Sequence, residues 1–100
     1  MNTKQVTLIV TFQARPGKEA ELRQTLLGLI PPTREEEGCI NYDLHVAADD
    51  PSKFLFYENW TTQAHLDKHG ESAHIQNLVR RMDELCVEDL KLSFWKKIGE

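Results

Sequence analysis

The sequence predicts one α+β domain in which a four-stranded antiparallel sheet carries two helices on one face. Three observations predict this fold class. The chain has 100 residues, the length of one domain. Segments with the period of two that is typical of strands alternate with segments that have the helical period. These segments follow the order strand, helix, strand, strand, helix, strand, which with right-handed crossovers gives a ferredoxin-like βαββαβ sandwich.

The first strand and the first helix are indicated by their hydrophobic periods. Residues 6–14 alternate and are rich in β-branched side chains, as strands are. Residues 18–37 repeat leucines at helical spacing and so predict a helix with one apolar stripe. Pro31 and Pro32 remove backbone donors within that helix, so we expect a kink or a short break at them. Gly38 is expected to end the helix.

The middle of the chain predicts a β-hairpin. Residues 39–46 alternate again, and residues 54–60 form an aromatic-rich segment typical of a strand. The intervening Asp49-Asp50-Pro51-Ser52 is a strong turn signal. We therefore expect the two strands to be joined by a seven-residue connection over 47–53.

The last third of the chain predicts an interrupted helix and a final strand. A short helix over 63–69 is followed by a break at Gly70, a longer helix over 73–85 and a strand over 87–98. The candidate N-caps are Thr61 or Thr62 for the short helix and Ser72 for the longer one. The residues expected to form the buried stripe of the longer helix are Ile75, Leu78, Val79 and Met82, and the final strand is expected to carry Leu90, Leu92 and Phe94 on one face.

The composition is that of a globular protein. Apolar residues make up 40% and charged residues 28%, which excludes disordered, collagen-like and membrane-spanning classes. The net charge is −4 and is mixed along the chain apart from the acidic run Glu35-Glu36-Glu37, so we expect no nucleic-acid and no membrane partner. No continuous apolar run of a signal peptide occurs, so we expect a cytoplasmic location. Cys39 and Cys86 are interpreted as small buried residues and not as a disulfide scaffold.

Apolar residues are expected on both faces of the central strands. Ile9 cannot face the helices if Val10 does, and Tyr57 likewise opposes Phe56. A single helix layer covers only one face of a sheet, and a large uncovered apolar face marks an interface. We therefore expect a homodimer in which two sheets pack face to face.

Histidines are the first candidates for chemistry. His65 and His69 share one helix face, as zinc-binding histidines do, but neither the H-E-x-x-H pattern nor a nearby cysteine accompanies them, so no metal is expected. His69 and His74 flank the break in the helix. Either could act as a general base because the imidazole pKa lies near neutrality, or each could simply bond the backbone at the break.

The aromatic hairpin is the second candidate region. Glu58 shares a strand face with Trp60, and a carboxylate in such company needs a partner because its burial unpaired is costly. Tyr42 and Tyr57 add aromatic surface with a hydroxyl. These residues either pack in the core or line a pocket for a flat apolar ligand. No nucleotide-binding motif is present, so no nucleotide cofactor is expected.

An ordered series of short motifs resembles a known family. The motifs are Gly38-Cys39-x-x-Tyr42-x-Leu44, Asp50-Pro51, Phe54-x-x-Tyr57-Glu58-x-Trp60 and His69-x-x-Ser72-x-His74. Together they resemble the antibiotic biosynthesis monooxygenase domain of the dimeric α+β barrel superfamily. The resemblance covers essentially the whole chain, so residues 1–100 are expected to form a single domain of this kind.

The resemblance implies a monooxygenase without metal or nucleotide cofactor, acting with O2 on hydroquinones, naphthols or related polycyclic phenols to give quinone-type products. Carried over by position, His74 is implied as the base or anion partner, with His69 second. Tyr42 and Trp60 are implied as aromatic walls and Glu58 as a residue that orients a neighbour, and Tyr57 joins them as a substrate-binding candidate.

Other functions of related proteins remain open. Heme-degrading relatives use an Asn in the first strand and a Trp in the second helix, and residues 6–14 and 63–86 contain neither. An isomerase of a phosphorylated, sugar-derived signalling molecule needs a cationic phosphate pocket, for which Arg80 and Arg81 are the only clustered arginines. A non-catalytic dimer that binds a small ligand is the third alternative, because fold alone does not decide function.

Overall fold

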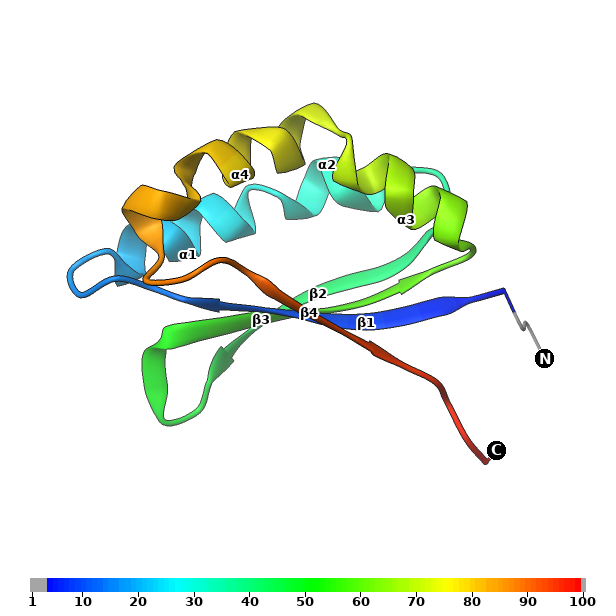
Figure 1. Cartoon of the computed structure of the whole chain (residues 1–100), viewed down its shortest axis with the longest axis horizontal. Coiled ribbons are helices and arrows are strands. Elements are labelled where there is room, and N and C mark those ends of the chain that lie inside the picture. Colours follow the sequence, from blue (N-terminus) through cyan, green and yellow to red (C-terminus); the bar gives the residue numbers. More distant parts are fainter. Residues whose placement is uncertain (1–3, 100) are drawn as a thin grey trace.

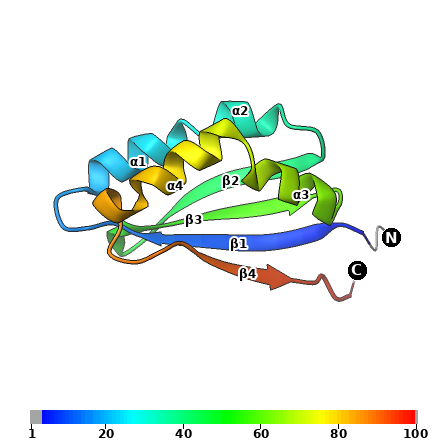
Figure 2. The same cartoon turned by 45° about the horizontal axis from the view of Figure 1, so that its top comes forward.

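The computed structural model describes residues 4–99 and has helices on one face of a four-stranded antiparallel sheet (Figure 1, Figure 2). The elements are β1 (Val6–Gln13), α1 (Glu19–Leu27), α2 (Ile30–Arg34), β2 (Cys39–Ala47), β3 (Asp50–Trp60), α3 (Gln63–Gly70), α4 (Ala73–Leu85) and β4 (Lys91–Trp95). The strand order across the sheet is β2-β3-β1-β4, so β2 and β4 are edge strands. The predicted α+β, ferredoxin-like fold is confirmed.

One row of side chains from the sheet faces the helices. Leu8 of β1 lies opposite Glu58 of β3, and Val10 lies opposite Phe56. Tyr42 of β2 continues the row on the other side of Glu58. Directly opposed residues of antiparallel strands project from the same face, so an acidic side chain stands within an apolar row. The largest fully buried apolar side chains of the core are Trp60, Tyr42, Phe56, Leu8, Leu22, Leu26 and Leu85.

The first helical segment is broken earlier than its prolines predict. α1 ends at Leu27 and α2 begins at Ile30, so the break precedes Pro31 and Pro32, which lie in the first turn of α2. The N–H groups of a first turn have no acceptor within the helix, so proline costs little there. The prolines thus begin a helix and do not kink one.

Gly38 connects the helical segment to β2, and two features require a glycine there. Its φ is +85°, a conformation that side chains with a Cβ rarely adopt. A Cβ at this position would also overlap the ring of His65 on α3. The carbonyl of Gly38 accepts a hydrogen bond of 2.8 Å from the N–H of Thr61, which ties the start of β2 to the end of β3.

The hairpin is tighter than the sequence predicts. Ala47 pairs with Asp50, so the seven-residue connection over 47–53 is wrong and β3 starts at Asp50. Of the predicted turn residues, Asp49 lies in the turn, whereas Asp50 and Ser52 belong to the strand. The Asp50 carboxylate accepts hydrogen bonds from the Ser52 N–H at 2.9 Å and from the Ser52 hydroxyl at 2.6 Å. The Ser52 hydroxyl in turn accepts one from the Gln13 side chain of β1 at 2.6 Å.

Both predicted N-caps of the second helical segment are present. The Thr62 hydroxyl accepts from the His65 N–H at the start of α3, and the Ser72 hydroxyl accepts from the Ile75 N–H at the start of α4. The buried stripe of α4 is shifted from the one expected, because Val79 is exposed. The stripe that is buried consists of Leu78, Met82 and Leu85.

The last strand is shorter than predicted. β4 spans only five residues of the expected 87–98, and Leu92 and Phe94 are about half exposed. They pair with Val10 and Leu8 and so share the helix-facing side of the sheet, but as residues of an edge strand they are only partly covered. In the described part of the chain, no helix has the length and apolar character needed to cross a bilayer.

Candidate active site

A cavity of about 460 Å³ lies between the sheet and the helices α3 and α4. Its floor comes from the central strands, its roof from the two helices, and its rim from the exposed side chains of Val79, Leu92 and Phe94. Most of its lining is aliphatic or aromatic, and the ionisable groups in it are Glu58, His69, Asp67 and Tyr42. Its volume lies in the range of small-molecule sites, and its lining suits an apolar ligand with a few polar groups.

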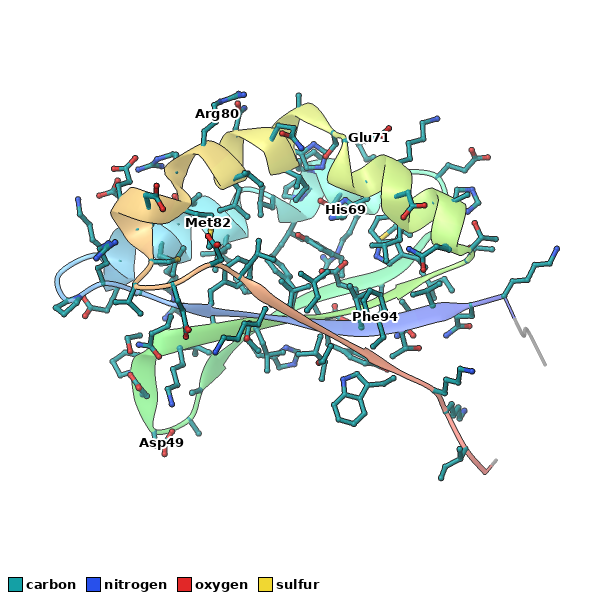
Figure 3. The ribbon with its side chains drawn as sticks, viewed as in Figure 1. Asp49, His69, Glu71, Arg80, Met82 and Phe94 are labelled. Carbon is teal, nitrogen blue, oxygen red and sulfur yellow. The ribbon has the colours of Figure 1, made fainter. Side chains whose placement is uncertain are left out.

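His69 is the imidazole of this cavity. It lies near the end of α3, is 6% exposed, and sits between the helix layer and the sheet (Figure 3). Its ring packs on Trp60 with a centroid distance of 4.6 Å and meets the edge of Tyr42 at 5.4 Å. Burial lowers the pKa of His69, although the neighbouring Glu36 opposes this effect, so burial favours the neutral form of the ring.

Glu36 joins His69 to His74. The carboxylate oxygen Oε2 of Glu36 is 2.7 Å from Nδ1 of His69 and 2.9 Å from Nε2 of His74. Glu36 lies in the connection between α2 and β2, whereas the two histidines come from α3 and α4. The break between α3 and α4 therefore brings two histidines to one carboxylate. The sequence predicts that His69 and His74 flank the break, but it does not predict the carboxylate.

Ser72 determines which nitrogen of His74 carries a proton. The Ser72 hydroxyl donates its hydrogen to the carbonyl of His69 at 2.7 Å, so it can only accept from Nε2 of His74 at 3.3 Å. His74 therefore carries a hydrogen on Nε2, which also points to Glu36. The carboxylate has no hydrogen of its own, so Nδ1 of His69 is the donor in the other contact. This leaves Nε2 of His69 as an unprotonated acceptor on the opposite edge of the ring.

Glu58 is the acidic group of the cavity. It is 3% exposed, and its Oε1 accepts a hydrogen bond of 2.9 Å from the indole N–H of Trp60. Burial raises the pKa of Glu58 to about 7, the Trp60 hydrogen bond offsets part of that rise, and the negative charge of Glu36 adds to it. A carboxyl group with this pKa can both accept and donate a proton near neutral pH.

The aromatic candidates divide between three positions. Tyr42 lines the cavity, stacks on Phe56 at 4.1 Å, and remains protonated because burial raises its pKa. Trp60 is completely buried behind the cavity, where it contacts both His69 and Glu58. Tyr57 lies on the opposite face of the sheet, is 41% exposed, and does not contribute to the cavity.

His65 and His69 do not act together, although they share a helix. Nδ1 of His65 is 2.8 Å from the Thr62 hydroxyl, and its Nε2 approaches Glu37 at 3.9 Å. The described groups that come close enough for a metal are instead Glu36, His69 and His74, whose ligand atoms lie within 4.8 Å of one another. Their 2.7 and 2.9 Å separations are those of hydrogen bonds, whereas ligands of tetrahedral zinc at about 2.0 Å stand roughly 3.3 Å apart.

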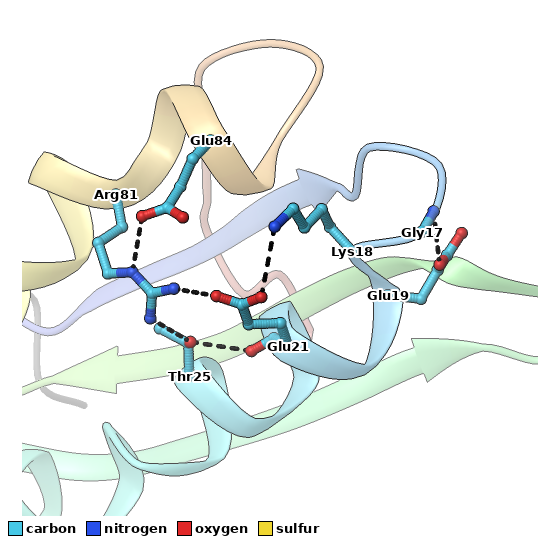
Figure 4. A network of polar contacts seen from close by, with 7 residues as sticks. All are labelled: Gly17, Lys18, Glu19, Glu21, Thr25, Arg81 and Glu84. Carbon is cyan, nitrogen blue, oxygen red and sulfur yellow. Dashed lines mark hydrogen bonds and ion pairs between the residues drawn. The ribbon is translucent and has the colours of Figure 1, made fainter.

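The clustered arginines lie away from the cavity. Arg81 bonds to Glu21, Thr25 and Glu84 across the outer surface of α1 and α4 (Figure 4). Arg80 bonds to Asn77 and points away from the sheet (Figure 3). Among the described residues that line the cavity there is no lysine or arginine. This lining offers no cationic site for a phosphate group.

A second hollow, of about 370 Å³, lies at the hairpin end of the sheet. Its lining includes His45, Lys53 and Lys91, but none of the candidate site residues.

Glu36 is the site residue that the sequence does not predict. Its only local signal is the acidic run Glu35-Glu36-Glu37, in which nothing distinguishes the middle residue.

The fold and the cavity together define a class: a small α+β sandwich whose sheet and helices enclose an apolar site with an imidazole and a carboxyl group. Comparison with known proteins places the chain within that class. The family model for antibiotic biosynthesis monooxygenase matches residues 5–81, and the chain belongs to this family.

Individual relatives agree with this assignment. "Putative monooxygenase Rv0793" of Mycobacterium tuberculosis is 34% identical over 98 residues, which cover 98% of this chain and 96% of the relative. "Putative monooxygenase YcnE" of Bacillus subtilis is 30% identical and covers 85% of this chain and 90% of its own. The crystal structure of PA3566 from Pseudomonas aeruginosa superposes with a TM-score of 0.92 at 30% identity and covers 99% of both chains. Family membership and these relatives support a monooxygenase-like function.

Proposed function

We propose that the protein is a cofactor-independent monooxygenase that oxidises hydroquinones or polycyclic phenols with O2. The observation that carries the proposal is the buried imidazole of His69, which lines an apolar cavity and contacts Glu36 through Nδ1, so that its Nε2 is left to accept a proton. A phenol that enters the cavity loses its proton to that nitrogen. The apolar lining limits the water around the electron-rich anion as it forms.

The reaction balances without an external reductant. The phenolate passes one electron to O2, and the two radicals recombine to form a C–O bond. The resulting hydroperoxide then loses water. Over the whole reaction the substrate loses two hydrogen atoms and gains one oxygen atom, and the second oxygen atom leaves as water. The substrate supplies all the electrons, so the protein has to orient the ring, take up a proton and return it.

The remaining residues of the cavity have roles that follow from their positions. Glu58 in its protonated form donates a hydrogen bond to the developing oxyanion or peroxide, which its pKa of about 7 allows at neutral pH. Tyr42 provides an aromatic wall. His74 was the first candidate for the base, but it does not line the cavity, so His69 takes that role in our proposal.

Oxygen uptake tests this proposal. We expect substrate-dependent O2 consumption with a panel of hydroquinones and naphthols, unaffected by prior treatment with EDTA. We expect His69→Ala to reduce kcat/KM by about 10²-fold or more, the usual contribution of a general base. His65→Ala is the matched control, because this histidine lies on the same helix as His69 but does not line the cavity. Binding of the phenols without any O2 uptake would instead support the non-catalytic ligand-binding alternative.

We also propose that the protein is a homodimer joined through the outer face of its sheet. Ile9 and Leu55 lie on that face, away from the helices, and Tyr57 and Trp95 on it are 41% and 58% exposed. Aromatic residues of this kind are enriched at interfaces. Light scattering at micromolar concentration should give twice the mass of the chain, and a stable monomer would contradict this part of the proposal.

A further inference from the structure

We propose that Glu36 is a positioning residue that fixes His69 in the tautomer with its hydrogen on Nδ1, and that His74 acts through Glu36 and not on the substrate. The inference deepens the proposed function and rests on it for its catalytic meaning. Its structural content, the tautomer of one histidine, is independent of any reaction.

One carboxylate oxygen of Glu36 contacts both histidines. Oε2 of Glu36 receives the His69 N–H at 2.7 Å and the His74 N–H at 2.9 Å. Two donors from two helices hold that oxygen in one place, and the Ser72 hydroxyl holds His74 in turn at 3.3 Å. A carboxylate held in this way bonds only to a protonated Nδ1, so the lone pair of His69 is confined to Nε2.

Glu36 and His74 lie outside the cavity that His69 lines. The cavity lining includes His69 but neither Glu36 nor His74. The side chains of His69, Glu36 and His74 are 7%, 18% and 23% exposed, so the chain of contacts runs from the cavity toward the surface. Glu36 and His74 therefore stand behind the imidazole, where they can orient it but cannot touch a bound ring.

Electrostatics give Glu36 a second effect on the same residue. The groups that contact His69 are Glu36, His74 of α4, Tyr42 of β2 and Trp60 of β3, and Glu58 and Asp67 line the same cavity. Burial lowers the pKa of His69, and the nearby His74 lowers it further. The Glu36 contact raises it. An imidazolium formed at His69 during proton transfer is stabilised by the adjacent carboxylate, so loss of Glu36 must weaken the base as well as release its orientation.

The test compares three variants by 15N NMR of the histidine rings in substrate-free protein. In the wild type we expect His69 to show a protonated Nδ1 and an unprotonated Nε2. Glu36→Ala should mix the tautomers, and Glu36→Gln, which keeps an acceptor without the charge, should retain the tautomer but titrate at lower pH. Glu35→Gln, one residue away and exposed, is the matched control and should change neither property. An unchanged tautomer in Glu36→Ala would overturn the inference.

Kinetics then separate the inference from the proposed function. If phenols are oxidised, Glu36→Gln should lower kcat/KM at least about tenfold and move the acidic limb of its pH profile to lower pH, because that limb reports the base of the free enzyme. His74→Ala should retain more activity than His69→Ala, and the reverse order would overturn the role given to His74. Absence of oxidation by the wild type would refute the proposed function, while the NMR result would still decide whether Glu36 fixes the tautomer.

Discussion

The burial of Glu58 predicts that this side chain makes the fold less stable as pH rises. The variant Glu58→Gln keeps an oxygen to accept the Trp60 hydrogen bond but removes the ionisation. The carboxyl pKa is about 7 in the folded protein and 4.5 in its ordinary state. The folded state therefore holds the Glu58 proton more tightly than the unfolded state. The contribution of this proton to the free energy of unfolding is complete below pH 4.5 and is lost as pH rises toward 7.

The magnitude follows from that difference. Each unit of pKa corresponds to about 1.4 kcal/mol, so the free energy of unfolding falls by roughly 3 kcal/mol through Glu58 between the two pKa values. Because Glu58 is 3% exposed, solvent screens little of this effect. We expect Glu58→Gln to be more stable than the wild type at pH 8 by about 1–3 kcal/mol, and nearly equal to it at pH 4.5.

Urea denaturation of both proteins at a series of pH values measures the effect. The free energy of unfolding should depend on urea concentration with the same slope in both proteins. The difference in this free energy then reports stability and not a change in the unfolded state. A stability difference between the two proteins that stays constant from pH 4.5 to 8 would show that Glu58 does not titrate with a raised pKa. The same conclusion would follow if Glu58→Gln were the less stable protein at pH 8.

Three further predictions concern local features of the fold and the site. Gly38→Ala should lower the free energy of unfolding by about 1–3 kcal/mol, because the position combines φ of +85° with an overlap on the His65 ring, and a thermal melt equal to the wild type would contradict this. Trp60→Phe removes the donor that holds the pKa of Glu58 down, so 13C NMR of the Glu58 carboxyl should give a midpoint above that of the wild type. Ser72→Ala removes the N-cap of α4 and should cost about 1 kcal/mol in denaturation experiments, whereas Ser72→Thr, which keeps a capping hydroxyl, serves as the control.

The sequence predicts features of this protein that depend on neighbouring residues. The alternation through Leu8 and Val10 predicts which face of β1 meets the helices, and the hydroxyls of Thr62 and Ser72 predict the starts of α3 and α4. Each of these features is decided within a few positions along the chain, where periodicity and capping chemistry operate.

The sequence does not predict, or predicts at the wrong place, the features that depend on contacts between distant residues. Glu36 reaches His69 and His74 across 33 and 38 positions, and within the acidic run it looks like any solvated glutamate. Asp50 and Ser52 have the composition of a turn, but their side chains bond to each other and to Gln13 inside the sheet. Val79 follows the helical period yet is exposed, because it borders the open rim of the cavity.

Labelling with 18O2 shows whether the protein inserts oxygen from O2 into a phenol. EDTA-treated protein is incubated with a hydroquinone or a naphthol under 18O2, and the product is analysed by mass spectrometry. The proposed chemistry predicts one 18O atom in each molecule of quinone-type product, with the second labelled atom recovered as water and turnover lost in His69→Ala. A product without the label, or no product from any phenol that demonstrably occupies the cavity, would contradict it.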